Sequence, residues 1–398
     1  MVIICIIIKR NRIIDCMINN RHKILYMVTS TRRMGGTERL FDNCINSRKC
    51  FDTVAFCSLF PPFNAQLRSF YNNNGVVFLA LRRWPYLLKI LLQYPIILFK
   101  LTHIIKVNEI NIVHVHDNLG MLFAVSAKLF ANIKVIRTFH AAVDNYFQLE
   151  HICYRLLRRS ISKTIFVSES FMKLYAKINR TGLGELRGRV IYNGLEFNKF
   201  EPKNESKNST NEYRLIMVGN YSGGRDHLFV TKVFHEILNS YVNTSLWLIG
   251  NIASGRKSKN RYSNCIDYTR NEKLSNKIEF IQNISDVTSY LLESDVFIYE
   301  STRDTFGMAI VEAMFCGLPC IINDLDVFQE ISNQGEFAVL FKTGDIGDCV
   351  EKTLSVLNNY EYHKEKAMNN ISIVKDKYSM ERYAKNLMEI YREVAEGM

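Results

Sequence analysis

Residues 295–331 constrain the fold more than any other part of this sequence. They predict an apolar strand, a polar loop, a helix that a Gly-Leu-Pro sequence should stop, and a second apolar strand. In order, these elements are residues 296–299, 300–306, 307–316 and 320–322. Strand, loop, helix and strand in this order indicate a parallel βαβ unit, and therefore an α/β protein.

Two acids, Asp304 in the loop and Glu312 on the helix, lie eight residues apart in this unit. The free N–H groups and the positive dipole end of a helix N-terminus suit a phosphate, and Gly307 allows close backbone approach. A pyrophosphate with a sugar at each end fits this layout, since each carboxylate can bind one sugar's hydroxyls. Such a hydrogen bond to a charged group contributes about 1.5–3 kcal/mol. The alternative is an ordinary βαβ unit with surface acids.

The segment from Asp304 to Met314, with Gly-Leu-Pro at 317–319, resembles the E-x7-E signature of family 4 glycosyltransferases of the group 1 type, which include bacterial capsular and exopolysaccharide enzymes. The resemblance covers the chain from residue 23 onward. It implies a retaining, nucleotide-sugar-dependent enzyme with the GT-B fold, in which two Rossmann-like domains face an interdomain cleft. The first Glu of the signature is Asp304 here, which is one methylene shorter, and Thr305 replaces the usual Gly.

The composition describes a globular protein of 398 residues, long enough for two α/β domains. A formal net charge of +12 suggests nucleic acid, an anionic membrane surface or an anionic small substrate as partner. The basic residues are spread along the chain and no nucleic-acid motif is recognisable, so a nucleotide-sugar and a membrane surface are preferred. The ten cysteines are scattered, which favours thiols in a reducing cytosol over a zinc site.

The family's first strand matches Ile24–Val28, so the residues before it are either an extension, with Met17 as a candidate start, or a short hydrophobic tag that touches membrane. A polar segment after residue 200 predicts the domain linker. The predicted parts are the extension at 1–22, an acceptor-binding Rossmann-like domain at 23–200, the linker at 201–212, a nucleotide-sugar-binding Rossmann-like domain at 213–378, and a helix at 379–398 that crosses back to the first domain.

Three places in the first domain carry candidate site residues. Gly35-Gly36 permits close approach to a ligand and, with Glu38, resembles the family's Gly-Gly-x-Glu loop, which borders the donor phosphates and the acceptor. His140 ends a strand at the edge where open α/β sheets bind ligands, and the resemblance places it against the donor sugar. His116 and Asp117 end the neighbouring strand and are assigned to the acceptor side, as are Gly35 and Glu38. The alternatives are a capped turn and structural histidines.

In the second domain, the family usually carries an Arg directly after Gly219 and a Lys five residues later, both of which neutralise the leaving diphosphate. Asn220 takes the Arg position here and Arg225 the Lys position, so one cation remains, and Arg303 is a candidate second. Ile284 lies in the segment that approaches the nucleotide base in the family. The predicted donor-binding residues are Gly36, Gly219, Asn220, Arg225, Ile284, Asp304, Thr305, Phe306, Gly307, Met308 and Glu312. The predicted catalytic residues are His140, Asp304 and Arg225.

Residues 81–106 mix basic, aromatic and apolar side chains, among them Trp84, Tyr94 and Lys106. This mixture suits a peripheral contact with an anionic membrane, and the alternative is a helix packed on the sheet with a basic outer face. No stretch spans a bilayer, because the uncharged run at 90–99 has about half of the roughly 20 residues needed.

The resemblance implies transfer of a sugar from a nucleotide-diphosphate sugar to an acceptor hydroxyl with retention of configuration. Glu312 would bind the ribose and Asp304 the donor sugar, while Arg225 and the amides of Gly307 and Met308 would stabilise the leaving diphosphate, so no metal or other cofactor is expected. A UDP-sugar is favoured and GDP-mannose is the alternative. The expected acceptor is a glycan or lipid-linked saccharide of a cell-surface polysaccharide, made in the cytoplasm with peripheral contact at the inner face of the membrane.

Three alternatives stay open beside this reading. The sequence Asp324-Leu-Asp326 imitates a metal-binding D-x-D, although its context argues against a metal. A GT-B epimerase or phosphorylase would have a different chemistry, and a requirement for a separate acceptor would discriminate against it. A basic membrane- or nucleic-acid-binding protein that retains a GT-B shell would bind its partner in a salt-sensitive way that Glu312→Gln does not change.

Overall fold

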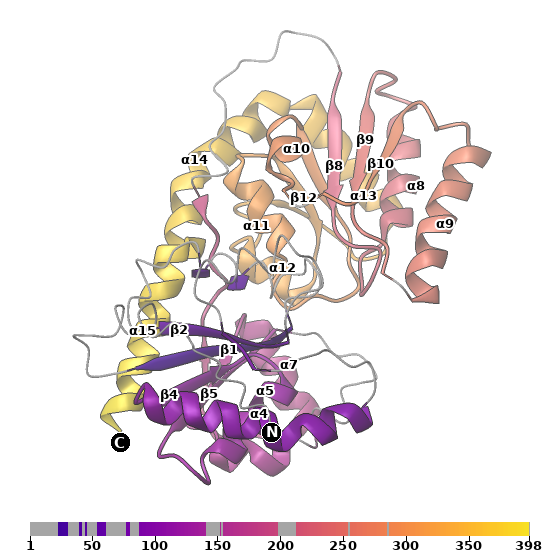
Figure 1. The fold of residues 1–398 in the computed structure, drawn as a ribbon. Coiled ribbons are helices and arrows are strands. Elements are labelled where there is room, and N and C mark those ends of the chain that lie inside the picture. Colours follow the sequence, from indigo (N-terminus) through magenta and orange to yellow (C-terminus); the bar gives the residue numbers. More distant parts are fainter. Residues whose placement is uncertain are drawn as a thin grey trace. The chain divides into compact units, whose positions relative to one another are not determined.

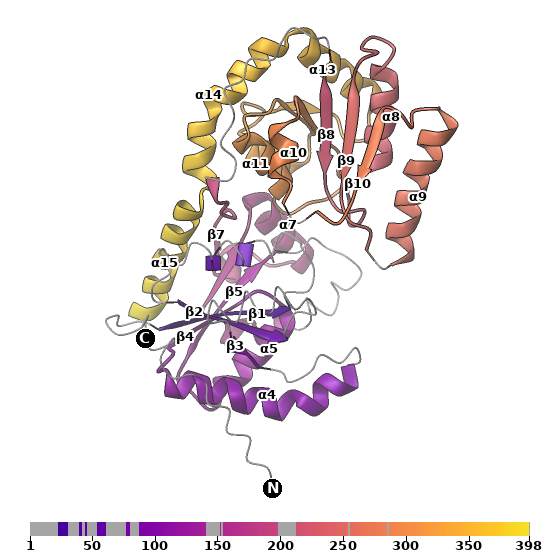
Figure 2. The ribbon, with the colours of Figure 1, turned by 45° about the horizontal axis from the view of Figure 1, so that its top comes forward.

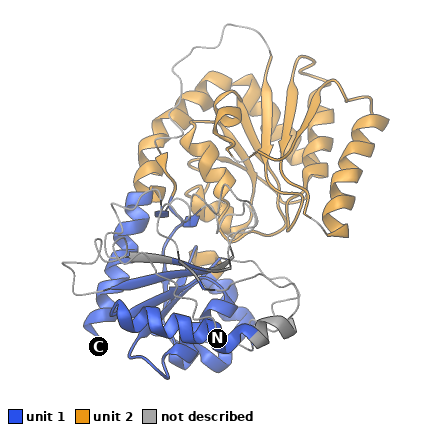
Figure 3. Cartoon of the chain, viewed as in Figure 1, with its two compact units in different colours: residues 1–167, 172–194, 380–398 blue, residues 168–171, 195–379 orange. Residues whose placement is uncertain are grey.

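The chain folds into two compact units, each built on a parallel sheet (Figure 1, Figure 3). Unit 1 comprises residues 1–167, 172–194 and 380–398, and unit 2 comprises residues 168–171 and 195–379. The α/β class and the two Rossmann-like sheets predicted from the sequence are confirmed. The structure, a computed structural model, describes residues 23–30, 40–41, 44–45, 54–60, 77–79, 87–140, 152, 154–197, 212–253, 255–284 and 286–397.

The described strands of unit 1 form a seven-stranded sheet in the order β3-β2-β1-β4-β5-β6-β7. These strands are β1 (Ile24–Ser30), β2 (Val54–Phe60), β3 (Val77–Phe78), β4 (Ile112–Val115), β5 (Lys134–Phe139), β6 (Lys163–Phe166) and β7 (Gly188–Val190). Helices α4 (Leu87–Val107), α5 (Asn118–Ala127), α7 (Glu169–Asn179) and α15 (Met380–Glu396) accompany them, with short 3-10 turns at Arg158–Ser160 and Gly184–Leu186. β4 is buried along its whole length, as expected for a parallel strand covered on both faces.

The last helix, α15, belongs to unit 1 although the chain reaches it only after unit 2 (Figure 3). Its apolar face contributes Tyr383, Leu387 and Tyr391 to a core that also contains Ile24 and Tyr26 of β1. A polar contact reinforces this packing, because the Tyr391 hydroxyl lies 2.7 Å from Nδ1 of the buried His114. α15 therefore completes the hydrophobic core on which β1 rests.

The described strands of unit 2 form a six-stranded sheet in the order β10-β9-β8-β11-β12-β13. Its strands are β8 (Arg214–Val218), β9 (Ser245–Ile249), β10 (Ile278–Ile281), β11 (Val296–Tyr299), β12 (Cys320–Asn323) and β13 (Val339–Phe341). Its helices are α8 (His227–Ile237), α9 (Arg256–Asn271), α10 (Thr288–Leu292), α11 (Met308–Phe315), α12 (Asp326–Ile331), α13 (Ile346–Asn358) and α14 (Tyr360–Tyr378). Figure 2 shows α8 and α9 together beside strands β8, β9 and β10.

The βαβ unit predicted at residues 296–322 is present as β11, α11 and β12, and the two strands pair in parallel. Two features differ from the expected layout. Helix α14 was not predicted, and the chain enters unit 2 after Gly194 rather than near residue 200. The Leu195 amide donates to the Tyr378 carbonyl at 3.0 Å, which draws this segment into unit 2.

Candidate functional site

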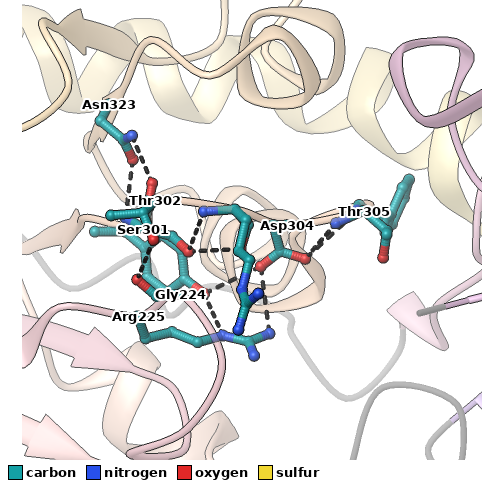
Figure 4. Close-up of polar contacts among 10 residues, drawn as sticks. Gly224, Arg225, Ser301, Thr302, Asp304, Thr305 and Asn323 are labelled. Carbon is teal, nitrogen blue, oxygen red and sulfur yellow. Dashed lines mark hydrogen bonds and ion pairs between the residues drawn. The ribbon is translucent and has the colours of Figure 1, made fainter. Parts of the chain in front are cut away.

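The strand order of unit 2 reverses between β8 and β11, which makes their carboxyl ends the natural ligand crevice of this sheet. The loop after β8 carries Gly219 to Asp226, and the loop after β11 carries Glu300 to Gly307. An isolated antiparallel bridge between Arg225 and Ser301 joins the two loops. Figure 4 shows the polar contacts where these loops meet.

The Asp304 carboxylate lies at the centre of these contacts, and its side chain is only 9% exposed. Its Oδ1 accepts hydrogen bonds from the amides of Thr305 at 2.8 Å and Phe306 at 3.4 Å. Its Oδ2 lies 3.3 Å from Nη2 of Arg225, within an ion pair. Asp304 and Arg225, which the sequence assigned separately to donor binding, are therefore brought together (Figure 4).

Tyr299, the last residue of β11, is a member of this cluster that the sequence analysis missed. Its hydroxyl accepts a hydrogen bond from Arg225 Nε at 3.0 Å and donates to Asp304 Oδ2 at 3.4 Å. Burial raises the pKa of Tyr299 to about 12, so the hydroxyl keeps its proton at neutral pH. The pKa of Arg225 is raised by Tyr299 and Asp304, so the guanidinium stays charged.

Helix α11 fixes the positions of Gly307, its N-cap, and Glu312. Gly307 is the N-cap in a left-handed conformation, at φ +87°, which favours glycine. An added Cβ would also lie 3.1 Å from side-chain atoms of Ile310, Phe328 and Ile331. Glu312 lies one turn into the helix and is 3% exposed. Met308 is the first residue of the helix, and backbone amides at a helix N-terminus can bind an anion.

The loop that carries Asp304 is fixed on both sides by its neighbours. Towards β8, the Thr302 amide donates to the Gly224 carbonyl at 3.0 Å. Towards β12, the Asn323 side chain accepts from the Ser301 amide at 3.1 Å and donates to the Ser301 carbonyl at 2.8 Å. Protein contacts therefore hold the loop on both of its sides (Figure 4). The exposed side chain of Arg303, the candidate second cation, follows Thr302 in this loop.

Asn220, which occupies the position of an Arg in the family, links the loops that follow β8 and β9 by a hydrogen bond. Its Oδ1 accepts from the Asn251 amide at 3.0 Å, and the Asn251 side chain in turn accepts from the Asn283 amide at 2.7 Å. These bonds connect the segments that follow β8, β9 and β10. Ile284, the predicted base-side residue, directly follows Asn283.

In unit 1, three histidines lie together on β4 and β5: the buried His114 within β4, the buried His116 directly after it, and the partly exposed His140 directly after β5. His116 Nδ1 is 2.8 Å from His140 Nε2, and the rings stack. His114 bonds Tyr391 and Thr138 at 2.7 Å each, which is a structural role. Burial lowers the pKa of His114 and of His140 to about 3 and that of His116 well below its usual range, so all three are neutral.

The remaining candidates divide into two groups. Asp117 caps helix α5, because its Oδ1 accepts from the Gly120 amide at 2.8 Å, and its assignment to the acceptor side stays a prediction. Gly35, Gly36 and Glu38 lie outside the described residues.

Asp324, the first acid of the D-x-D sequence, accepts hydrogen bonds from the hydroxyl and the amide of Thr343 at 2.6 and 2.9 Å. Burial opposes its ionisation, but the Thr343 bonds outweigh burial and lower the pKa of Asp324. Asp326 lies in the first turn of α12. Asp324 thus connects the segments after β12 and β13, and no group of three or more potential metal ligands occurs among the described residues.

Two protein-family models together match residues 48–372 of this chain. A model described as Glycosyltransferase Family 4 matches residues 48–199, and one described as Glycosyl transferases group 1 matches residues 198–372. This chain belongs to the family 4, group 1 glycosyltransferases. The Asp304–Arg225 cluster and Glu312 fall within the group 1 match, and the His116–His140 pair falls within the other.

Two relatives of this glycosyltransferase differ in how much of their length it spans. It is 21% identical over 315 residues to the N-acetyl-alpha-D-glucosaminyl L-malate synthase of Bacillus anthracis, covering 76% of this chain and 81% of that protein. It is 31% identical over 180 residues to the serotype-specific mannosyltransferase WbdA of Escherichia coli, covering 44% of this chain but only 21% of WbdA. The chain therefore spans about a fifth of the mannosyltransferase.

The GT-B fold of this glycosyltransferase is shared with a solved structure of Anabaena HepE in complex with UDP and glucose. The TM-score is 0.76 at 16% identity, and the match covers 93% of this chain and 99% of that one. At this identity the likeness shows the fold.

Proposed function

We propose that this glycosyltransferase moves a sugar from a nucleotide-diphosphate sugar to a glycan or lipid-linked acceptor during synthesis of a cell-surface polysaccharide. The observation that carries the proposal is the pairing of a buried acid and a cation, Asp304 and Arg225, beside the N-terminus of α11 at the sheet's switch point. The related mannosyltransferase WbdA and the capsular polysaccharide glycosyltransferase CapM of Staphylococcus aureus favour this class of product.

Each proposed role is the one that the resemblance to family 4 enzymes implies, and each fits the chemistry of its residue. Arg225 and the amides of Gly307 and Met308 stabilise the charge that grows on the leaving diphosphate, and loss of one such preorganised donor typically adds about 2.7–4 kcal/mol to the barrier. The Glu312 carboxylate binds the ribose hydroxyls and Asp304 faces the donor sugar. With the acceptor attacking on the face from which the diphosphate departs, the configuration is retained without a protein nucleophile or a metal. His140 is proposed to contact the donor sugar.

Nucleotide binding tests this proposal directly. One of UDP, GDP and ADP, at 100 times its dissociation constant, is expected to stabilise the wild type by about 2.7 kcal/mol. Glu312→Gln should lose most of this stabilisation, because a hydrogen bond to a charged group contributes about 1.5–3 kcal/mol. Thermal unfolding with each nucleotide measures both. Glu351→Gln is the matched control, since the Glu351 side chain is 77% exposed on α13.

Two outcomes of this measurement speak against the proposal. If none of the three nucleotides shifts the unfolding temperature, the nucleotide-sugar function is wrong. If Glu312→Gln and wild type shift equally, the donor lies elsewhere in the chain. The HepE structure with UDP leads us to expect UDP as the best ligand, with GDP as the alternative that the mannosyltransferase relatives suggest.

Helix α4 supports a peripheral membrane contact as part of this function. Its Ile97 and Leu101 are buried, whereas Ile96 is 50% and Phe99 is 74% exposed. The helix carries three lysines and no Asp or Glu. An exposed apolar face on a basic helix binds an anionic lipid surface in the plane of the interface. No described helix has the length and hydropathy needed to cross a bilayer.

Vesicle binding tests this contact. We expect the protein to co-sediment with phosphatidylglycerol-containing vesicles, less at high salt. Phe99→Glu should weaken binding by about tenfold or more, because burial of a Phe side chain contributes roughly 1.5–3 kcal/mol. The control is Val242→Glu, which places the same charge at a 67% exposed apolar position of unit 2. Equal binding by Phe99→Glu and Val242→Glu would refute α4 as the contact.

A further inference from the structure

The acid and the cation of the unit 2 site both depart from the family pattern, and they depart in opposite directions. Asp304 is one methylene shorter than the family's Glu, whereas Arg225 is longer than the family's Lys. The structure shows these two side chains in contact, with 3.3 Å between Arg225 Nη2 and Asp304 Oδ2. In this chain the shorter acid and the longer cation are therefore in direct contact across the two loops.

Tyr299 adds a second fixed point for the same guanidinium. Arg225 Nε donates to the Tyr299 hydroxyl at 3.0 Å, so two different nitrogens of one planar group are held by two neighbours. The Tyr299 ring is itself immobilised, because it is 1% exposed and lies against the rings of Phe297 and Phe328. Gly219 leaves room for the stem of Arg225, since an added Cβ there would lie 3.2 Å from Arg225 Cγ.

We propose that Tyr299 and Asp304 are positioning residues that hold the Arg225 guanidinium ready for the diphosphate of the donor. The proposal rests on the function proposed above and adds to it a positioning role for Tyr299 and, for Asp304, a positioning role besides the one toward the donor sugar. Both oxygens of Asp304 already accept protein hydrogen bonds. The N–H groups of Arg225 that neither partner uses are the ones that meet the phosphates, and the Arg225 side chain is 33% exposed.

The physical gain lies in preorganisation. A free Arg side chain has many rotamers, and their loss opposes binding when a ligand first orders the side chain. Here the cluster orders Arg225 before the ligand arrives. Since only one cation occupies the two positions that are basic in the family, the placement of this cation matters more than it would in a site with two.

A length-exchange experiment tests the pair. We expect Arg225→Lys and Asp304→Glu each to weaken UDP, GDP or ADP binding, whichever the wild type prefers, by about tenfold. The double variant, which restores the family's Lys and Glu, should recover binding to within about threefold of wild type. If the double variant is as weak as the product of the two single effects, the matched-pair proposal is overturned.

Tyr299→Phe tests the positioning role with a single hydroxyl. Binding of the nucleoside diphosphate should weaken by about threefold to tenfold, whereas binding of the corresponding nucleoside, which lacks phosphates, should not change. Tyr154→Phe is the control, because that buried hydroxyl also bonds protein groups but lies in unit 1. An equal loss for nucleoside and nucleoside diphosphate would show a general structural effect and overturn the proposal.

A ligand-free measurement separates failure of this proposal from failure of the proposed function. Thermal unfolding compares the wild type with Tyr299→Phe, Arg225→Lys and the variant that combines these two changes. The losses of stability should not be additive, since Tyr299 and Arg225 share a contact. Additive losses would overturn the positioning role even if nucleotides bind. If the losses of stability are not additive but the protein binds no nucleoside diphosphate, the positioning role stands and the proposed function is wrong.

Discussion

Replacement of Gly250 by alanine is expected to destabilise unit 2 by about 3 kcal/mol or more. Gly250 directly follows β9, and a Cβ at this position would lie 1.8 Å from the backbone oxygen of Gly219. That carbonyl cannot turn away without a loss, because it accepts a hydrogen bond from His227 Nε2 at 2.8 Å. The Gly219 amide also donates to the Ile249 carbonyl at 2.8 Å, which fixes the separation of the two strands.

Equilibrium denaturation by urea measures this effect. The matched control is Gly347→Ala in α13, where the nearest atom to an added Cβ, Oδ1 of Asp345, lies at an ordinary 3.5 Å. This control should gain up to about 1 kcal/mol, because alanine is the better helix former. If Gly250→Ala unfolded at the wild-type urea concentration, the close approach of β8 and β9 described above would be wrong.

Glu300→Gln is expected to stabilise the protein at alkaline pH. Glu300 is 2% exposed, and burial raises its pKa from 4.5 to about 8. A hydrogen bond from the Gly344 amide opposes this rise, and the nearby carboxylates of Asp226 and Asp324 add to it. The folded state therefore binds the proton of Glu300 more tightly than the unfolded chain does. As the pH rises from 4.5 to 8, the unfolded carboxyl ionises first and the folded state loses stability.

Glutamine mimics the protonated acid at every pH, so the variant escapes this loss. Its advantage over wild type should be small below pH 4.5, grow up to pH 8 and then level off at on the order of 3 kcal/mol. Denaturation of both proteins between pH 5 and pH 9 measures the difference. A constant difference across this range would mean that the folded protein does not hold the Glu300 proton, and a loss of stability at pH 9 would reverse the expected sign.

The fold could be predicted from the sequence because the patterns that indicate it lie within short, continuous segments. A buried strand, a helix stopped by Gly-Leu-Pro, and a second strand define the βαβ unit of residues 296–322 without knowledge of any other part of the chain. The predicted Asp304 and Arg225 meet in the structure for a related reason. Both follow strands whose carboxyl ends lie at the same edge of a parallel sheet.

The partners of these residues could not be predicted, because they depend on distances between segments far apart in sequence. Whether Asn220 faces a ligand or bonds Asn251 is decided by how closely β8 and β9 approach. Tyr299 resembles any buried strand residue until Arg225 is seen beside its hydroxyl. Asn323 likewise ends an apolar strand, and only the loop geometry shows that it holds Ser301.

The position of α15 has a consequence for how the chain folds during synthesis. The core beneath β1 includes Leu387 and Tyr391, which leave the ribosome more than three hundred residues after Ile24. All of unit 2 is translated between them. The first unit to emerge is therefore the last to complete its core, and the apolar surface of β1 that α15 covers waits for the second unit before it is shielded from water.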